Sequence, residues 1–288
     1  MKSNYISKGI IMLLALVGSN YSHAQQATIV VSNSTDAQRQ ELVEVNMSDV
    51  KSKLAGISPK KGEAYIVKNK AGQQIGSQIT HDGKLLIDAS VRPHGSATYY
   101  ISVGKPYQQK VWTTGALYKI RKDDIAWEND RCAYRVYGPA LQRTGERSFG
   151  TDIWAKNTPD TVVYERYVMD KQGNVDGDKV DEKVKSEERK MKNLSGAALG
   201  NGLDPYRVGA TLGLGAPSLM IGNQQFLPYC YKTYKILDNG PLRFTVELTY
   251  NPSTIGDMQN VVEHRIISLD KGSNFNKMTV WYEGLTHP

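Results

Sequence analysis

Ionic, amide and aromatic side chains are concentrated in one stretch near the middle of the chain, residues 127–138. It opens with Trp127 and four consecutive polar residues, Glu128 to Arg131, and continues with alternating tyrosine and arginine up to Tyr137. Such a string can supply an aromatic platform for the C–H face of a sugar, with charged groups that orient hydroxyls or a carboxylate. A salt-bridged turn followed by an edge strand explains the pattern equally well, because four adjacent polar residues are costly to bury without partners.

Aspartate, tryptophan and lysine alternate in a second segment, residues 150–156. If this segment is extended, Asp152, Trp154 and Lys156 lie on one side of it. An aromatic ring between opposite charges is typical of a sugar subsite. A half-exposed strand with a partly buried tryptophan is the alternative interpretation.

Glycine is dense in a third segment, residues 200–216. Glycines allow tight backbone bends, from which Asp204, Tyr206 and Arg207 would project. The segment is not a phosphate loop, because it contains no Gly-Lys-Ser/Thr and no strand-to-helix pattern surrounds it.

His264 is the sole histidine between His94 and His287. Histidine is the side chain best suited to proton transfer near neutral pH, although a lone histidine in a strand is more often structural. The sequence contains no nucleophile elbow, zinc-protease helix motif or dinucleotide fingerprint, which argues against those classes of hydrolase and redox enzyme.

No metal site and no cofactor are expected. The two cysteines, Cys132 and Cys230, have no neighbouring histidine cluster, and we expect two buried free thiols in preference to a disulfide. Residues 170–181 resemble a calcium loop, but Val175 stands where the loop needs glycine and Asp181 where it needs glutamate. An Asp/Gly-rich turn is therefore favoured.

The first 24 residues read as a secretory signal peptide with cleavage after Ala24. Lys2 and Lys8 precede an apolar run that is shorter than the ~20 residues a helix needs to span a bilayer, and no lipobox cysteine follows. We expect a periplasmic or secreted protein without membrane insertion. The net charge is +7, without a basic block interleaved with aromatic residues, which argues against a nucleic-acid partner.

Short alternating runs bounded by turn residues predict an all-β protein. Residues 25–110 are expected to form a small β-sandwich, and a larger β domain is expected at residues 111–288. The strands are predicted at residues 28–31, 41–45, 64–69, 73–79, 84–88, 97–103, 116–127, 133–137, 161–169, 226–237, 242–250, 261–269 and 277–282.

The cleanest alternation is found at residues 242–250, directly after the turn sequence Asp-Asn-Gly-Pro at residues 238–241. Leu242 and every second residue up to Tyr250 form an apolar face, and the polar face is suited to lining a groove. The chain stops in mid-pattern, so we expect a copy truncated before the last strands of this domain.

Several of these motifs resemble a family with an uncharacterised domain found in Bacteroidota, typically encoded among polysaccharide-degrading enzymes. The likeness covers nearly the whole chain after the signal peptide. The motifs that carry it are residues 127–138, 150–156, 202–204, 206–209, 236–244 with their Asp-Asn-Gly-Pro-Leu-Arg run, and 263–270. The family is similar in fold to the galactose-mutarotase-like β-supersandwich, preceded by a small β-sandwich.

This resemblance implies action on uronate-containing oligosaccharides, by an elimination that forms an unsaturated uronyl end. The reaction needs a base, an acid and a group that stabilises the carboxylate. His264 or Tyr134 could serve as acid and base, Arg131 or Arg135 as carboxylate clamp, and Asp204 as an orienting group. The residues expected to contact an acidic oligosaccharide are Trp127, Glu128, Asp130, Arg135, Asp152, Trp154, Lys156, Asp204, Tyr206 and Arg207.

One departure from the family pattern leaves the activity open. A stretch rich in histidine and aspartate often precedes the Gly-Leu-Asp of the family, and residues 193–201 of this chain contain neither. If those residues are catalytic, this chain binds sugar without turning it over or uses another base. A glycan-binding module without catalysis is therefore the alternative, and a structural subunit of an envelope complex is a third possibility.

Overall fold

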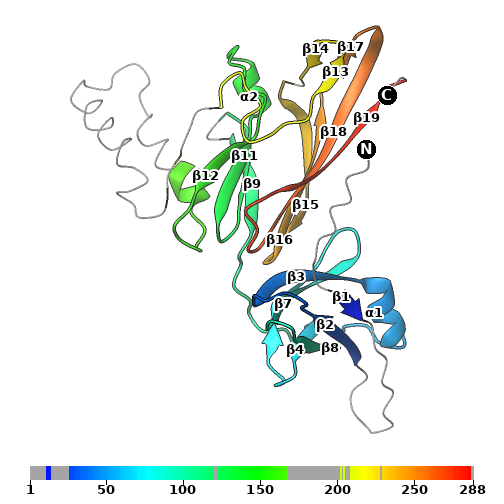
Figure 1. Cartoon of the computed structure of the whole chain (residues 1–288). Helices are drawn as coiled ribbons and strands as arrows, with labels where there is room; N and C mark the ends of the chain where they lie inside the picture. Colours follow the sequence, from blue (N-terminus) through cyan, green and yellow to red (C-terminus); the bar gives the residue numbers. More distant parts are fainter. Residues whose placement is uncertain are drawn as a thin grey trace, which may run out of the picture. The chain divides into compact units, whose positions relative to one another are not determined.

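The structure is a computed structural model that describes residues 11–13, 26–119, 122–167, 202, 204, 208–227 and 229–286. The chain divides into two compact units, Met1–Lys110 and Val111–Pro288 (Figure 1). Antiparallel sheets make up both units, so the predicted all-β class is confirmed. Of the predicted signal peptide, only β1 (Ile11–Leu13) lies among the described residues, where it pairs with β2.

The first unit is a small β-sandwich. One sheet has the order β1-β2-β8-β4-β5 and the other the order β3-β7-β6. The strands are β2 (Ala27–Ser32), β3 (Arg39–Asn46), β4 (Ala64–Asn69), β5 (Gln74–Ile75), β6 (Ser77–Ile79), β7 (Lys84–Val91) and β8 (Ser96–Gly104). Alternate apolar residues such as Ile29 and Ile101 from one sheet meet Val45 and Ile87 from the other in a common core, which explains the period-two pattern of the sequence. A helix that the sequence patterns did not predict, α1 (Met47–Lys53), adds Met47 and Val50 to this core.

The second unit contains two larger layers. Its strands are β9 (Thr114–Tyr118), β10 (Asp124–Glu128), β11 (Cys132–Val136), β12 (Asp152–Ala155), β13 (Leu219–Ile221), β14 (Gln224–Phe226), β15 (Tyr231–Asn239), β16 (Arg243–Tyr250), β17 (Ser253–Ile255), β18 (Met258–Asp270) and β19 (Lys277–Glu283), and a short helix, α2 (Pro139–Gln142), follows β11. One layer, the β9–β12 sheet, has the order β12-β11-β10-β9. The other, the β15–β19 sheet, has the order β15-β16-β18, with β19 and β17 both paired to β18. Strands β13 and β14 form a separate hairpin.

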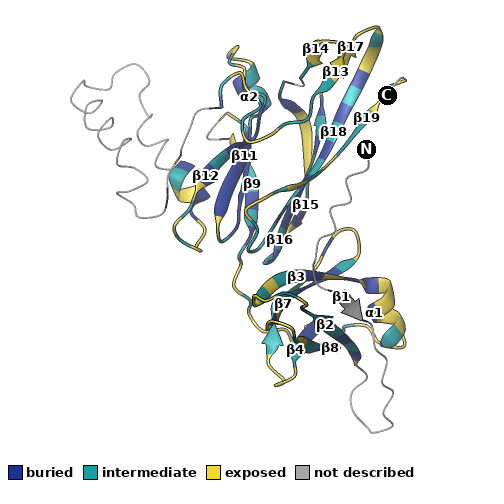
Figure 2. Ribbon diagram, viewed as in Figure 1, coloured by how far each residue is buried: buried dark blue, intermediate teal, exposed yellow. Residues whose placement is uncertain are grey.

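An aromatic and aliphatic core joins the two layers. Figure 2 shows buried residues, in dark blue, along strands of both layers. The Trp127 ring stacks at 5.9 Å on Phe244 of β16 and at 6.1 Å on Tyr134 of β11. The apolar face predicted at residues 242–250 supplies Phe244, Val246 and other core residues, and its polar face points away from this core. We call the face of each sheet that points away from this core its outer face.

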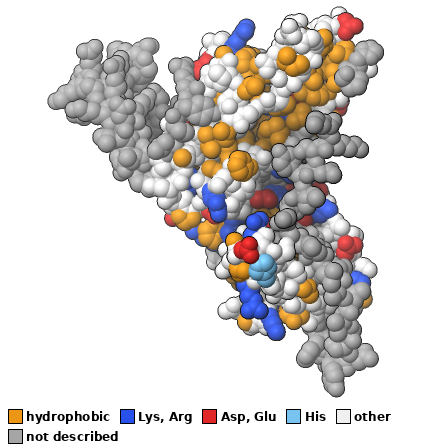
Figure 3. Space-filling model, in the orientation of Figure 1, with side chains coloured by type: hydrophobic (Ala, Val, Ile, Leu, Met, Phe, Trp, Pro, Cys, Tyr) orange, Lys and Arg blue, Asp and Glu red, His pale blue; other side chains and the backbone are white. Residues whose placement is uncertain are grey.

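One predicted strand is wrong. Residues 163–167 form a helical turn, because the carboxylate of Glu128 accepts hydrogen bonds from the backbone N–H groups of Val162 and Val163 and so fixes the start of a helix. Three other predicted strands are interrupted: residues 116–127 between β9 and β10, residues 73–79 between β5 and β6, and residues 226–237 between β14 and β15. In the last two cases the two pieces belong to different sheets. Among the described residues, no helix has the length and apolar character that crossing a bilayer requires. Hydrophobic side chains gather on the surface of the second unit around the β13–β14 hairpin, where Met220 is 57% exposed (Figure 3).

Candidate functional site

Polar and aromatic side chains share the outer face of the β9–β12 sheet. Strand alternation directs Asp124 of β10, Arg135 of β11 and Asp152 of β12 to this face, while Ile125 and Trp127 point into the core. Alanine occupies the neighbouring outward positions 116, 126 and 133, which leaves room for larger side chains above the sheet. With residues from the following segments, the outward side chains form what we call the Arg135 cluster: Asp124, Arg135, Tyr137, Asp152, Trp154, Arg166, Tyr167 and Asp204.

Arg135 is the central cation of this cluster. Its Nε and Nη2 both lie 2.6 Å from Oδ2 of Asp152, and its Nη1 lies 3.6 Å from Asp124. The Tyr137 hydroxyl donates a hydrogen bond of 3.2 Å to the same Asp152 oxygen. Burial by itself would lower the pKa of Arg135, but Tyr137, Tyr167 and the two aspartates together raise it, so its charge is compensated at any physiological pH.

An aromatic wall flanks the ion pairs. Tyr167 stacks on Tyr118 with ring centroids 4.4 Å apart, and its ring lies 5.3 Å from that of Trp154. Its hydroxyl donates to Asp124 at 3.2 Å. Two guanidinium groups lie over the Trp154 ring, that of Arg135 at 5.1 Å and that of Arg166 at 5.5 Å. The wall therefore combines π surface with cations, as sites for planar or anionic ligands often do.

Asp204 reaches the cluster because a glycine holds its segment against β12. Gly202 has a φ of +118°, and a Cβ there would lie 1.9 Å from the carbonyl oxygen of Ala155. Burial raises the pKa of Asp204 and Asp152 raises it further, against the opposing effects of Arg135, the Trp154 N–H and Arg166. The residue as a whole is nevertheless exposed, so a ligand in solution can reach it.

Trp154 presents an indole N–H to the same place. Its side chain is 8% exposed, and its Nε1 makes no hydrogen bond of standard geometry among the described residues, although it favours the charged form of Asp204. A buried donor of this kind is costly unless it gains a partner. The Trp154 N–H and the Asp204 carboxyl thus lie close together in the Arg135 cluster, without a hydrogen bond of standard geometry between them.

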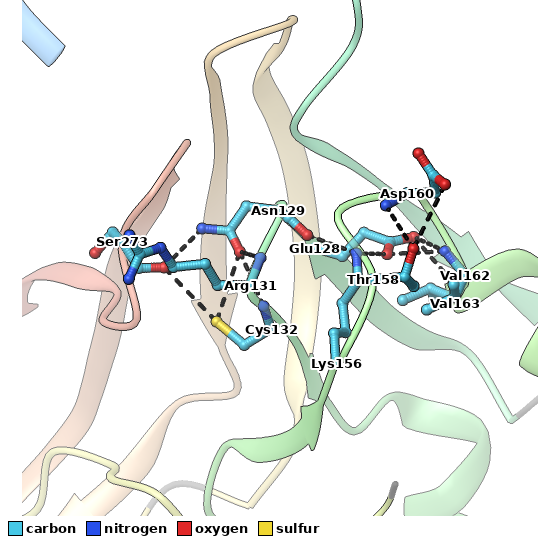
Figure 4. A network of polar contacts seen from close by, with 10 residues as sticks. All are labelled: Glu128, Asn129, Arg131, Cys132, Lys156, Thr158, Asp160, Val162, Val163 and Ser273. Atoms are coloured by element: carbon cyan, nitrogen blue, oxygen red, sulfur yellow. Dashed lines mark hydrogen bonds and ion pairs between the residues drawn. The ribbon is translucent and has the colours of Figure 1, made fainter. Parts of the chain in front are cut away.

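Glu128 and Lys156, both expected to contact substrate, are engaged with each other instead (Figure 4). Lys156 Nζ lies 2.7 Å from Glu128 Oε2 and donates to the carbonyl oxygen of Asn129 at 2.6 Å. The lysine side chain is 0% and the glutamate side chain 2% exposed, so neither is free to bind sugar hydroxyls. Their contacts fix the helical turn at residues 163–167 that carries Arg166 and Tyr167.

The first residues of the 127–138 segment hold the turn between β18 and β19 in place by hydrogen bonds. Asn129 donates a hydrogen bond of 2.6 Å from Nδ2 to the carbonyl oxygen of Asp270. The same Nδ2 donates to the carbonyl oxygen of Ser273 at 2.7 Å (Figure 4). Asp130 accepts the backbone N–H of Gly272 at 2.7 Å. These side chains therefore position a turn through hydrogen bonds, but the strand that follows them, β11, lies between β10 and β12 and is not the edge strand of the alternative interpretation.

The remaining predicted residues of that string do not reach the Arg135 cluster. Trp127 is completely buried and donates to Asn276, so its ring cannot serve as a sugar platform. Tyr134 is buried in the core, and its hydroxyl donates to the carbonyl oxygen of Asn274. Arg131 is exposed beside the hairpin between β10 and β11. A clamp by Arg131 and proton transfer by Tyr134 at the Arg135 cluster therefore do not fit this geometry.

His264 lies on the outer face of the other layer. It faces away from the core on β18, where its ring stacks on Trp281 of β19 at 4.9 Å. The core between the two sheets separates His264 from Arg135. The expectation that this imidazole acts together with an arginine clamp at one site therefore does not fit the structure. Tyr206 and Arg207 lie outside the described residues.

The structure adds four members of the cluster that the sequence patterns did not reveal, Asp124, Tyr137, Arg166 and Tyr167. Asp124 and Tyr137 could have been found, because each lies an even number of residues from an outward-facing neighbour in its strand. Arg166 and Tyr167 could not, because that segment was predicted as a strand. In the part of the chain that the structure describes, no group of three or more His, Cys, Asp or Glu side chains is placed to hold a metal ion.

The sequence model of a family described as a domain of unknown function, DUF4861, matches residues 31–287. The chain belongs to this DUF4861 family. A relative, "Uncharacterized protein P7" of Formosa agariphila, is 23% identical over 279 residues, which are 91% of this chain and 65% of the relative. The chain thus covers just under two thirds of that relative's length. The membership of an uncharacterised-domain family with a Bacteroidota relative, as the motifs predict, is confirmed.

The match to the DUF4861 family extends over parts of both units and includes the whole Arg135 cluster. Neither the family description nor the name of the relative assigns an activity.

Proposed function

We propose that this chain is an exported carbohydrate-active protein that acts on uronate-containing oligosaccharides at the Arg135 cluster, within a polysaccharide-degrading system. The supporting observation is the placement of Asp204, with its raised pKa, beside Arg135, Arg166 and the Trp154 ring. We further propose that the second unit is a mutarotase-like β-supersandwich, which the two stacked antiparallel layers support.

The charge of Arg166 favours an acidic ligand. Its guanidinium lies 5.5 Å from the centroid of the Trp154 ring, and that of Arg135 lies 5.1 Å from the same centroid. A ligand carboxylate at this aromatic surface would meet positive charge from both arginines. Since a guanidinium can pair with a carboxylate in a bidentate manner, Arg166 replaces Arg131 as the clamp in this proposal.

Elimination is the reaction that this arrangement supports best. A base removes the proton at C5 of the uronate, the bond between C4 and the leaving oxygen breaks, and that oxygen takes up a proton. Asp204 is the suitable base, because its raised pKa makes its carboxylate more basic than an ordinary one. Burial raises the pKa of both Tyr137 and Tyr167, so these phenols stay protonated, and Tyr137, which is partly exposed, is the suitable proton donor to the leaving oxygen.

The test is incubation of the full chain with polygalacturonate and glucuronate oligosaccharides, followed by the ultraviolet absorbance of unsaturated uronyl products. We expect Asp204→Asn to abolish the absorbance change while Asp257→Asn, at an exposed aspartate between β17 and β18, preserves it. We expect His264→Ala to preserve it too, because that imidazole lies on the other layer. Normal turnover by the Asp204→Asn variant would refute the proposal.

A glycan-binding module is the alternative, and the compensation of Arg135 by two aspartates favours it, because a fully paired cation has no charge left for catalysis. Calorimetric titration with the same oligosaccharides separates the two. Binding that depends on Asp204 without any absorbance change identifies the module. The absence of both binding and turnover contradicts a carbohydrate role for this site.

A further inference from the structure

A second aromatic feature lies on the outer face of the β15–β19 sheet, away from the Arg135 cluster. His264 and Trp281 are direct register partners on β18 and β19, and their rings are nearly parallel, 8° apart, with centroids separated by 4.9 Å. Because His264 covers one face of the indole, the second face of Trp281 is directed away from His264. We call Thr249, His264, Thr279, Trp281 and Glu283 the Trp281 platform.

Hydrogen bonding fixes the imidazole beneath the indole. His264 Nδ1 lies 3.2 Å from Oγ1 of Thr249, its partner on β16. His264 Nε2 lies 3.2 Å from Oε1 of Glu283, although this pair lacks the geometry of a hydrogen bond. The His264 side chain is only 13% exposed, so it is held between the sheet and the indole. The Trp281 residue is partly exposed, and because its ring is anchored in this way, a ligand that packs on it does not have to order the side chain first.

Polar groups border the indole along β19. Thr279 and Glu283 lie two residues before and two residues after Trp281, so all three side chains project to the same side of the strand. Both are exposed, and the Glu283 side chain is 68% exposed. An aromatic plane with a hydroxyl and a carboxylate at its edge matches a pyranose ring, whose C–H face packs on π surface while its hydroxyls donate to acceptors.

We propose that the Trp281 platform is a binding site for neutral pyranose sugars, distinct from the Arg135 cluster. The preference for a neutral sugar follows from Glu283, because its charge would repel a uronate carboxylate stacked on the same ring. His264 is a positioning residue for the indole at this site. The histidine therefore has a role here, although it lies too far from the Arg135 cluster to transfer protons there. This inference does not require the proposed elimination, because it concerns another surface and another ligand.

The experiment is calorimetric titration of the full chain with cellohexaose, xylohexaose and mannohexaose. We expect at least one of them to bind, and we expect Trp281→Ala to weaken that binding roughly 10- to 30-fold, the loss typical of a central aromatic contact. Trp281→Tyr, which keeps a ring, is expected to lose less than about 3-fold. Glu283→Ala is expected to weaken binding by a smaller factor without affecting the fold, since that side chain is exposed.

Two control variants test whether neutral-sugar binding is confined to the Trp281 platform. Trp112→Ala removes a partly exposed tryptophan elsewhere in the same unit and should leave neutral-sugar binding unchanged. Asp204→Asn should also leave it unchanged, while it abolishes turnover of the acidic substrate. Equal binding by Trp281→Ala and the unaltered chain overturns the inference, as does the failure of all three probes to bind at millimolar concentration. If Trp281→Ala does not fold, unchanged binding by Glu283→Ala overturns it instead.

Discussion

Replacement of Lys156 by methionine would separate a structural role from a substrate-binding role for the Glu128–Lys156 pair. Both side chains are almost completely buried, with the lysine nitrogen 2.7 Å from the carboxylate. Methionine fills a similar volume but leaves Glu128 as a buried charge without its cation. It also removes the hydrogen bond to the carbonyl oxygen of Asn129.

The expected cost follows from the contacts that remain. Removal of one partner of a buried ion pair costs about 3–5 kcal/mol. Glu128 retains hydrogen bonds from the backbone N–H groups of Val162 and Val163, at 2.9 Å to each, so we expect the lower end of that range, about 3 kcal/mol. For a domain of this size each kcal/mol lowers the Tm by about 2–4 °C, which gives a decrease of roughly 6–12 °C.

The assay is urea unfolding with a double-mutant cycle. Glu128→Gln should also destabilise the protein, because it leaves a buried ammonium group with weaker acceptors. The double variant Glu128→Gln/Lys156→Met should cost at least about 2 kcal/mol less than the sum of the two single variants, since it removes both charges. Lys277→Met, at an exposed lysine of β19, serves as the control and should change the free energy of unfolding by less than about 0.5 kcal/mol.

Two results would refute this reasoning. Additivity of the single variants within about 0.5 kcal/mol would mean that the two charges do not interact in the folded protein. Unchanged stability of Lys156→Met, together with lost binding of acidic oligosaccharides, would mean that the lysine contacts substrate after all.

Three further outcomes are expected. Gly115→Ala should lower the free energy of unfolding by about 1–3 kcal/mol, because its Cβ would lie 2.5 Å from the Phe244 ring; an unchanged urea midpoint contradicts this packing. Burial raises the pKa of Cys132 and that of Cys230, the latter to about 12. A thiol reagent should therefore label neither cysteine in the native protein and both in denaturant. Labelling of only one thiol, or of none, in denaturant contradicts the assignment of two free thiols. Burial raises the pKa of Glu263 above its ordinary 4.5, so the folded state binds the Glu263 proton more tightly than the unfolded state does. The free energy of unfolding should therefore fall as pH rises from 4.5 through the raised pKa, and Glu263→Gln should abolish this fall. Parallel pH profiles of the variant and the unaltered chain would contradict this pH dependence.

Much of the fold could be predicted from periodicity. The strand predicted at residues 64–69 coincides with β4, and those predicted at residues 242–250 and 261–269 match β16 and β18 closely. In these strands the apolar residues alternate with polar ones, and a strand with one buried face requires that pattern. The prediction was wrong at residues 161–169, because a helical turn there depends on a carboxylate 34 residues earlier in the chain.

The types of residue that could form a site were evident from the sequence, but their grouping was not. Arg135, Asp152, Trp154 and Asp204 were singled out and do converge on one sheet face. Glu128 and Lys156 were singled out by the same criteria and pair with each other below the surface. Residue type and spacing do not distinguish a charge that awaits a ligand from one that already has a partner.

The sequence by itself determined the β class of this protein and which residues of each strand share a face, because both follow from a local two-residue period. The tertiary structure alone decided which faces point into the core and which strands become neighbours. It placed His264 and Arg135 on different layers and buried Trp127 between them. These relations depend on the packing of segments more than 100 residues apart, and no local pattern encodes them.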